Sequence, residues 1–142
     1  MKRFRIVIDT NVLIAALRSP SGASFQIVQL IGRGYFEISL SVPLVLEYES
    51  VAKRELDNLV VDAEDVDDLI DYICQVSRHN EIFYTWRPQL RDPDDEMVLE
   101  LAIGSMSDAI VTFNKRDFAG TEQFGIRLLT PVELLNEIGV LK

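Results

Sequence analysis

Segments with the hydrophobic pattern of a β-strand and segments with that of an α-helix follow one another along this chain. Residues 4–8 form a β-branched apolar run, which is typical of a strand buried on both faces. Residues 12–17 are apolar and follow a polar Asp-Thr-Asn turn, so they predict a helix. A second helix is expected over about residues 24–33, and strict alternation predicts a strand over residues 36–40. The first third of the chain is therefore predicted to run strand, helix, helix, strand.

The rest of the chain continues this alternation. Helical spacing of apolar residues predicts helices that begin after the cap residue Ser41, at an acidic capping-box pattern in 62–65, at 92–96 and at 130–133. Short apolar runs predict strands at 109–112 and 127–129, and a weak strand is expected at 81–84. The pattern predicts an α/β fold, a three-layer α/β/α sandwich with a central, mostly parallel sheet, formed as one domain over residues 1–142.

The amino-acid composition excludes several kinds of functional site. The 142 residues, 48% of them hydrophobic, suit one domain with a substantial core. The single cysteine, Cys74, and the single histidine, His79, exclude an internal disulfide and a Cys- or His-rich zinc site, and neither is expected to be catalytic. Lys and Arg number 14 against 23 Asp and Glu, so a polyanionic ligand would need a local cationic patch, a bound metal or both. No apolar run approaches the roughly 20 residues of a membrane helix, and no signal-peptide pattern is present, so a cytoplasmic protein is expected.

Acidic side chains are predicted to gather where ligands bind in such folds, at the carboxyl ends of the parallel strands. Asp9 directly follows the first strand, and Asn114 and Asp117 follow the strand that ends at residue 112. Glu47 and Asp95 border the apolar stripes of their helices, where a charge is unfavourable unless it is paired or metal-bound. Each acid has a structural alternative. Asp9 and Asp117 could cap a helix or a turn, and Asp95 could occupy a favourable helix-dipole position. Glu47 could pair with an arginine, or lie at the edge of the apolar stripe where its carboxylate reaches water.

The other acids are given structural roles. Asp92 is expected to cap its helix and Asp94 to be solvated. Asp108 precedes its strand, which places it at the opposite end of the sheet from the candidate site. The acidic run over residues 62–71 mostly faces away from an apolar stripe and is predicted to be a solvated helix face.

The acidic set predicts a hard-cation site. Carboxylates without histidine or cysteine partners suit Mg²⁺ or Mn²⁺ rather than zinc. Two such ions about 4 Å apart can activate a water molecule and stabilise the leaving oxygen in phosphodiester hydrolysis.

Four segments, in order, resemble the motifs of PIN domains. They are Ile-Val-Ile-Asp-Thr-Asn-Val at 6–12, the acid-containing helix start at 41–48, Arg-Asp-Pro-Asp-Asp-Glu with the helix that follows at 91–102, and Ile-Val-Thr-Phe-Asn-Lys-Arg-Asp-Phe at 110–118. The third segment is similar to a bacterial subgroup of toxins from toxin–antitoxin systems. The resemblance covers nearly the whole chain and implies a compact α/β/α fold and a Mg²⁺- or Mn²⁺-dependent endoribonuclease of the VapC type.

The resemblance also implies roles for single residues. Asp9, Glu47 and Asp95 match metal-binding, catalytic acids of the family; Thr10 and Asn11 match positions that shape the first turn, and Thr112 matches a hydroxyl that lines the site. The family usually has Thr-x-Asp in the last motif, whereas this chain has Thr-Phe-Asn. Asn114 therefore supplies an amide oxygen without charge, and Asp117 is left to support a second metal ion.

RNA binding needs cations and aromatic rings. Lys115 and Arg116 lie beside the last motif, and Arg87 and Arg91 precede the third acid. With Tyr84 and Trp86 they could form a rim for phosphates and bases, or they could be ordinary surface residues.

The expected partners are an RNA substrate, a cognate antitoxin protein and a second copy of the chain. One alternative is a catalytically weak or inactive PIN-fold module that binds RNA or protein, which the Asn114 departure favours. Another is a phospho-acceptor receiver domain with Lys115 as its lysine, but no aspartate follows the second or third predicted strand as that site requires.

Overall fold

A parallel sheet forms the centre of the protein. The computed structural model describes residues 4–81 and 93–140. Five strands pair in the order β3-β2-β1-β4-β5, and every pair is parallel. The strands are β1 (Arg5–Ile8), β2 (Glu37–Leu40), β3 (Arg78–His79), β4 (Ala109–Val111) and β5 (Arg127–Leu129). The predicted α/β class with a parallel sheet is confirmed.

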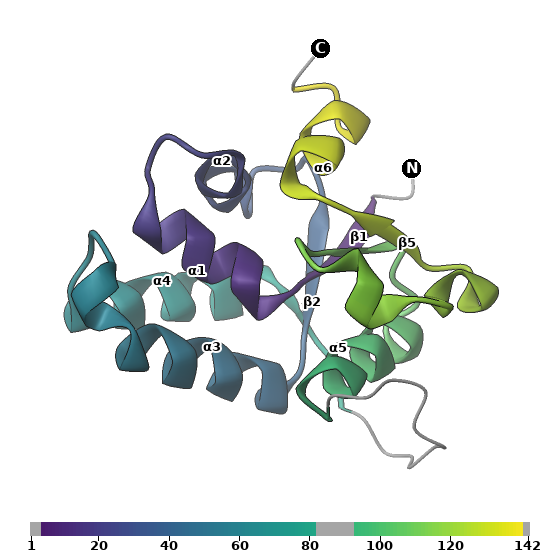
Figure 1. Ribbon diagram of the computed structural model, residues 1–142, viewed down its shortest axis with the longest axis horizontal. Coiled ribbons are helices and arrows are strands. Elements are labelled where there is room, and N and C mark those ends of the chain that lie inside the picture. Colours follow the sequence, from purple (N-terminus) through teal and green to yellow (C-terminus); the bar gives the residue numbers. More distant parts are fainter. Residues whose placement is uncertain (1–3, 82–92, 141–142) are drawn as a thin grey trace.

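Helices cover both faces of this sheet. They are α1 (Thr10–Arg18), α2 (Ala23–Leu30), α3 (Val42–Arg54), α4 (Ala63–Val76), α5 (Pro93–Gly104) and α6 (Pro131–Glu137). Figure 1 shows α1 to α4 on one side of β1 and β2 and α5 on the other, while α6 packs beside α2. Right-handed crossovers explain this arrangement: the chain moves outward from β1 to β3 and then crosses back to β4, so α5 lies on the opposite face.

Several helix starts follow their sequence signals. Ser41 caps α3 through its side chain, with a proline in the first turn. Asp62 and Asp65 form a reciprocal capping box at α4, and Thr130 and Glu133 form another at α6. The acidic residues of α4 lie on its solvent face, where 67, 68 and 71 are exposed.

Two predicted elements are placed differently. A weak strand was expected at 81–84, but the strand β3 is formed by Arg78 and His79. Residue 81 lies outside β3, so the prediction is wrong at that residue. Residues 82–84 lie outside the described part of the chain. Polar, exposed residues form β3 because the edge of β2 offers backbone partners there. The helix expected to reach residue 33 ends at Leu30, because Gly32 adopts a left-handed backbone (φ +79°) that leaves the helix.

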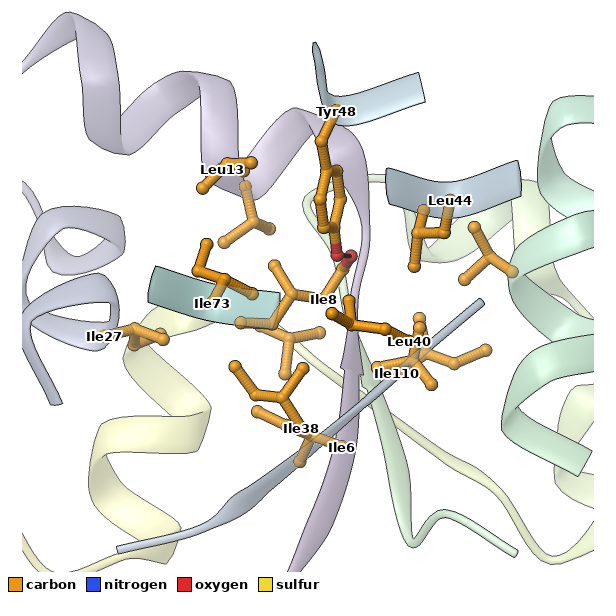
Figure 2. Close-up of a cluster of buried hydrophobic side chains, with 14 of the residues drawn as sticks. Ile6, Ile8, Leu13, Ile27, Ile38, Leu40, Leu44, Tyr48, Ile73 and Ile110 are labelled. Atoms are coloured by element: carbon orange, nitrogen blue, oxygen red, sulfur yellow. Dashed lines mark hydrogen bonds between the residues drawn. The ribbon is translucent and has the colours of Figure 1, made fainter. Parts of the chain in front are cut away.

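The central strands are buried on both faces, as their apolar runs predict. Ile6, Val7 and Ile110 have no exposed surface. Figure 2 shows isoleucine and leucine side chains of the sheet and of the helices meeting around these strands. This rigid centre positions the strand ends described next. Within residues 4–81 and 93–140, no helix has both the length and the apolar character needed to cross a membrane.

Candidate active site

The candidate site lies where two central strands end side by side. β1 and β4 are neighbours, but the chain continues from β1 towards β2 and from β4 towards β5. Such a reversal point opens a crevice at the carboxyl edge of a parallel sheet. The Asp9 backbone N–H donates to the Val111 carbonyl at 2.9 Å, which extends the pairing and places Asp9 beside Thr112.

Asp9 combines a structural role with a position in the site. Its side chain is nearly buried, with 7% of the residue exposed. Oδ1 accepts from the backbone N–H of Thr10 at 2.9 Å, which makes Asp9 the cap of α1, as the structural alternative predicted. Oδ2 accepts from the Thr112 hydroxyl at 2.7 Å, and Thr112 Oγ1 also accepts from the Asn114 backbone N–H at 3.0 Å. The carboxylate is therefore held both from the start of α1 and from the residue that follows β4.

Thr10 links this carboxylate to the second predicted acid. While its N–H donates to Asp9, its hydroxyl donates to Glu47 Oε2 on α3. The two acids, 38 positions apart in the sequence, are thus hydrogen-bonded to the same residue. Thr10, which the family resemblance assigns to shaping the first turn, is in contact with both acids.

Tyr48 fixes α3 against the end of β1. The side chain is 2% exposed, and its hydroxyl donates to the Ile8 carbonyl, the last residue of the strand. Figure 2 shows the phenol oxygen of Tyr48 directed at Ile8 from above the core. Burial raises the pKa of Tyr48 well above its ordinary value, and the negative charges of Asp9 and Glu47 raise it further. The phenol therefore stays neutral and keeps its proton as a donor.

This buried phenol is expected to make the protein less stable at alkaline pH. The folded state retains the proton while the unfolded chain releases it near pH 10, so we expect Tyr48 to lower the free energy of unfolding as the pH rises above about 10. The contribution approaches about 1.4 kcal/mol per pH unit. Urea unfolding from about pH 8 to pH 11, compared between wild type and Tyr48→Phe, measures it. The variant is expected to be about 1–2 kcal/mol less stable at neutral pH but to lose this part of the alkaline slope; parallel profiles would contradict the assignment.

One cleft brings the predicted acids together. It has a volume of about 340 Å³ and is lined from the residue after β1, from α1, α3 and α5, and from the segment after β4. Its lining residues are Asp9, Thr10, Asn11, Ile14, Arg18, Glu47, Val51, Arg54, Glu55, Asp95, Asn114 and Asp117. Asp108 lies elsewhere, as expected: its Oδ2 accepts from the backbone N–H of Arg5, at the start of β1, at 2.8 Å. The predictions for Asp92 and Asp94 lie outside the described residues and side chains.

Sequence reasoning missed the basic end of this cleft. Arg18 lies seven positions after Asn11 on α1, and Arg54 lies seven after Glu47 on α3, so helical spacing places each on the face of its acidic or amide neighbour. Arg18 forms an ion pair with Glu55, the residue that ends α3. The helical spacing was available in the sequence, but the packing of α1 against α3 was not.

The donor set fits a hard divalent cation. Carboxylate, amide and hydroxyl oxygens line the cleft, with no imidazole or thiol in its lining. Asn11 Oδ1 is buried, and no hydrogen-bond donor among residues 4–81 and 93–140 reaches it. In the part of the chain that the structure describes, no three acidic, histidine or cysteine side chains lie close enough together to hold one ion. Binding would therefore require the carboxylates to move inward.

A second hollow adjoins the acidic cleft. It has a volume of about 760 Å³, shares Asn114 and Asp117 with the cleft, and is also lined by Phe113, Lys115, Arg116, Thr130 and Glu133. Lys115 Nζ lies 2.6 Å from Glu133 Oε1, and this contact lowers the pKa of Glu133. Of the cations predicted to bind RNA, Lys115 and Arg116 thus lie beside the acids, whereas Arg87 and Arg91, with Tyr84 and Trp86, lie outside the described residues.

Comparisons with known proteins agree with this architecture. The family model of the PIN domain matches residues 5–116. A search of curated proteins finds no match. Among solved structures, the chain is similar to one chain of VapBC2 from Rickettsia felis, a complex crystallised with a DNA fragment from its promoter, with a TM-score of 0.59 and 12% identity over 89% of this chain and 98% of that one.

The family match extends from β1 to the segment after β4 and so includes Asp9, Glu47 and Asp95. The chain belongs to the PIN domain family, as its motifs indicated. PIN domains are generally nucleases.

Proposed function

We propose that this protein is a divalent-metal-dependent endoribonuclease and the toxin of a toxin–antitoxin pair. The observation that carries the proposal is the single cleft lined by Asp9, Glu47, Asp95 and Asp117, which come from distant parts of the chain. Membership in the PIN family supports nuclease chemistry. The cleft lies at the carboxyl edge of the sheet, where this fold class binds its ligands.

Asp9, Glu47 and Asp95 are the residues that would hold Mg²⁺ or Mn²⁺, with Asn114 and Asp117 on the side that adjoins the second hollow. A bound divalent cation supplies Lewis-acid activation of water and neutralises charge on the phosphate. Thr10 and Thr112 orient the carboxylates of Glu47 and Asp9 through their hydroxyls. Hydrolysis by this class of chemistry is expected to leave 5′-phosphate and 3′-hydroxyl ends.

Cationic side chains offset the acidity around the site. Arg18 and Arg54 line one end of the cleft, and Arg116 is exposed beside the other and forms no ion pair within the described residues. Guanidinium groups bind phosphate oxygens through paired N–H donors. An RNA strand crossing the acids would meet a cation on either side, although the protein as a whole carries a net charge of −9.

Two partner proposals follow, one from the similar structure and one from the family resemblance. The similar structure is an assembly of a toxin–antitoxin type, VapBC2, and this favours a cognate antitoxin for the present protein. A homodimer stays a prediction from the family resemblance. Copurification with the product of a neighbouring gene, and the mass of the purified protein in solution, test these two proposals.

Removing divalent cations is expected to abolish RNA cleavage. Incubation of the purified protein with labelled single-stranded RNA should give cut products with Mg²⁺ or Mn²⁺, and background cutting with excess EDTA. Added Mn²⁺ should restore cleavage and raise the melting temperature, because a cation that binds only the folded state stabilises it. Full cleavage in EDTA would contradict metal dependence.

Asn114 favours a second candidate, a PIN-fold module that binds RNA with little or no catalysis. An amide oxygen at this position removes one negative charge from the cleft that the usual acid would supply. The same assay separates the two functions. Stabilisation by Mn²⁺ and binding of RNA without any cleavage would favour the binding module.

A further inference from the structure

An exposed aromatic ring lies between two residues of the site. Phe113 separates Thr112, which is fully buried and bonded to Asp9, from Asn114, which lines the acidic cleft. Phe113 is nevertheless 49% exposed. Singly exposed apolar side chains are common on protein surfaces, so what distinguishes Phe113 is its position between two residues of the site, where a bound ligand would cover the ring.

The backbone around Phe113 is fixed on both sides. The Thr112 N–H donates to the Leu129 carbonyl at 2.9 Å, and the Asn114 N–H donates to Thr112 Oγ1 at 3.0 Å. The next residues form a short 3₁₀ turn that ends at the fully buried Phe118. These contacts hold the segment in one conformation, so the exposed ring is presented without the entropy loss of ordering a loop.

The surroundings of the ring suit a nucleotide. Phe113 lines the 760 Å³ hollow together with Arg116, which forms no ion pair within the described residues, and with the ion pair of Lys115 and Glu133. The hollow shares Asn114 and Asp117 with the acidic cleft. Proteins that bind single-stranded nucleic acid combine a cationic groove with aromatic rings on which bases stack. A phosphate in the cleft and a base in the hollow would thus belong to adjacent parts of one strand.

We propose that Phe113 is a stacking platform for a base of single-stranded RNA, next to the phosphate that enters the acidic cleft. This inference rests on the proposed nuclease function and adds to it a residue that contacts a base. Bases stacked within a duplex cannot lie on the ring, so Phe113 would bind an unstacked base of a single strand, loop or end. Stacking is tolerant of sequence, because every base has a π-face.

The test measures RNA binding in an Asp9→Asn background, in which the RNA stays intact. Fluorescence anisotropy with a short labelled single-stranded RNA of mixed sequence should show about 5- to 100-fold weaker binding for Phe113→Ala, and near wild-type binding for Phe113→Trp. An abasic RNA of the same length keeps the phosphates and lacks the bases, so Phe113→Ala should not change its affinity. The matched control is Tyr35→Ala, which removes a similarly exposed ring (46%) just before β2, at the amino end of the sheet.

Each other result overturns the inference in a recognisable way. Equal RNA affinity with and without the ring shows that Phe113 does not stack, while wild-type cleavage would leave the nuclease function standing. Equal losses on normal and abasic RNA show that the ring acts through the backbone. A change in oligomeric state with unchanged RNA affinity assigns Phe113 to a protein contact. A wild-type protein that neither binds nor cleaves RNA overturns both proposals.

Discussion

Replacing Asp9 with asparagine is expected to slow RNA cleavage about a thousandfold or more while the protein still folds. The change removes one negative charge from the centre of the cleft, and charge stabilisation by a cation at such a site is worth several kcal/mol in the transition state. Asparagine caps helices about as well as aspartate, so α1 keeps its start. The free energy of unfolding should change by less than about 1 kcal/mol. Single-turnover cleavage and urea unfolding of the same preparation measure the two effects.

Asp108→Asn is the matched control for this experiment. It removes the same charge from the opposite end of the sheet, where Asp108 accepts from the Arg5 backbone N–H. Cleavage by this variant should equal that of wild type. If Asp9→Asn cuts RNA as fast as wild type, or if both variants lose activity equally, Asp9 is not a catalytic acid.

Replacing Phe118 with alanine is expected to destabilise the protein by about 3–5 kcal/mol. Phe118 has no exposed surface, and its turn packs against α5 and β5. Removing the ring leaves a cavity beneath the segment that carries Asp117, so the carboxyl edge of the sheet should loosen as well. Urea unfolding measures the loss of stability, and hydrogen exchange over residues 112–118 measures the loosening.

Phe113→Ala provides the control for that change, because the same atoms are removed five positions earlier from a half-exposed ring. Its effect on stability should be within about 0.5 kcal/mol. If both variants lost the same amount, the buried position of Phe118 would not explain its effect. The pair also separates the two uses of phenylalanine in this segment, one for packing and one for binding.

Much of the fold could be predicted from the sequence because local signals agree with it. The apolar runs of β1 and β4 are long enough to identify strands buried on both faces, and the capping residues of α3, α4 and α6 mark where helices begin. The strand β3 could not be predicted in the same way. Its residues, Arg78 and His79, carry no strand signal, and only the free edge of β2 makes them extended.

The residues of the candidate site likewise fall into those that local sequence signals predict and those that only the packing of the chain brings into the site. Asp9 and Asn114 follow strands, so the topology of a parallel sheet is sufficient to bring them together. Glu47 could be placed on the inner side of its helix by spacing alone, but its link to Asp9 through Thr10 requires the packing of α3 on α1. Arg54 shares a helix face with Glu47 by its spacing, but only the packing of α1 against α3 makes that face line the cleft. Phe113 gave no local signal, because it lies in no sequence pattern that distinguishes a lining residue from an ordinary surface residue.

The shortness of β3 bears on how the protein avoids the addition of a foreign strand to its sheet. A long, bare outer strand is a template on which another chain can add its own backbone. At β3 an incoming strand would meet only two residues, one of them an arginine whose guanidinium lies 3.6 Å from Glu37. The other margin, β5, carries Arg127, clamped by two contacts to Glu137. Charged side chains thus lie on both outer strands of the described sheet, and they disfavour the addition of a strand from another chain at either edge.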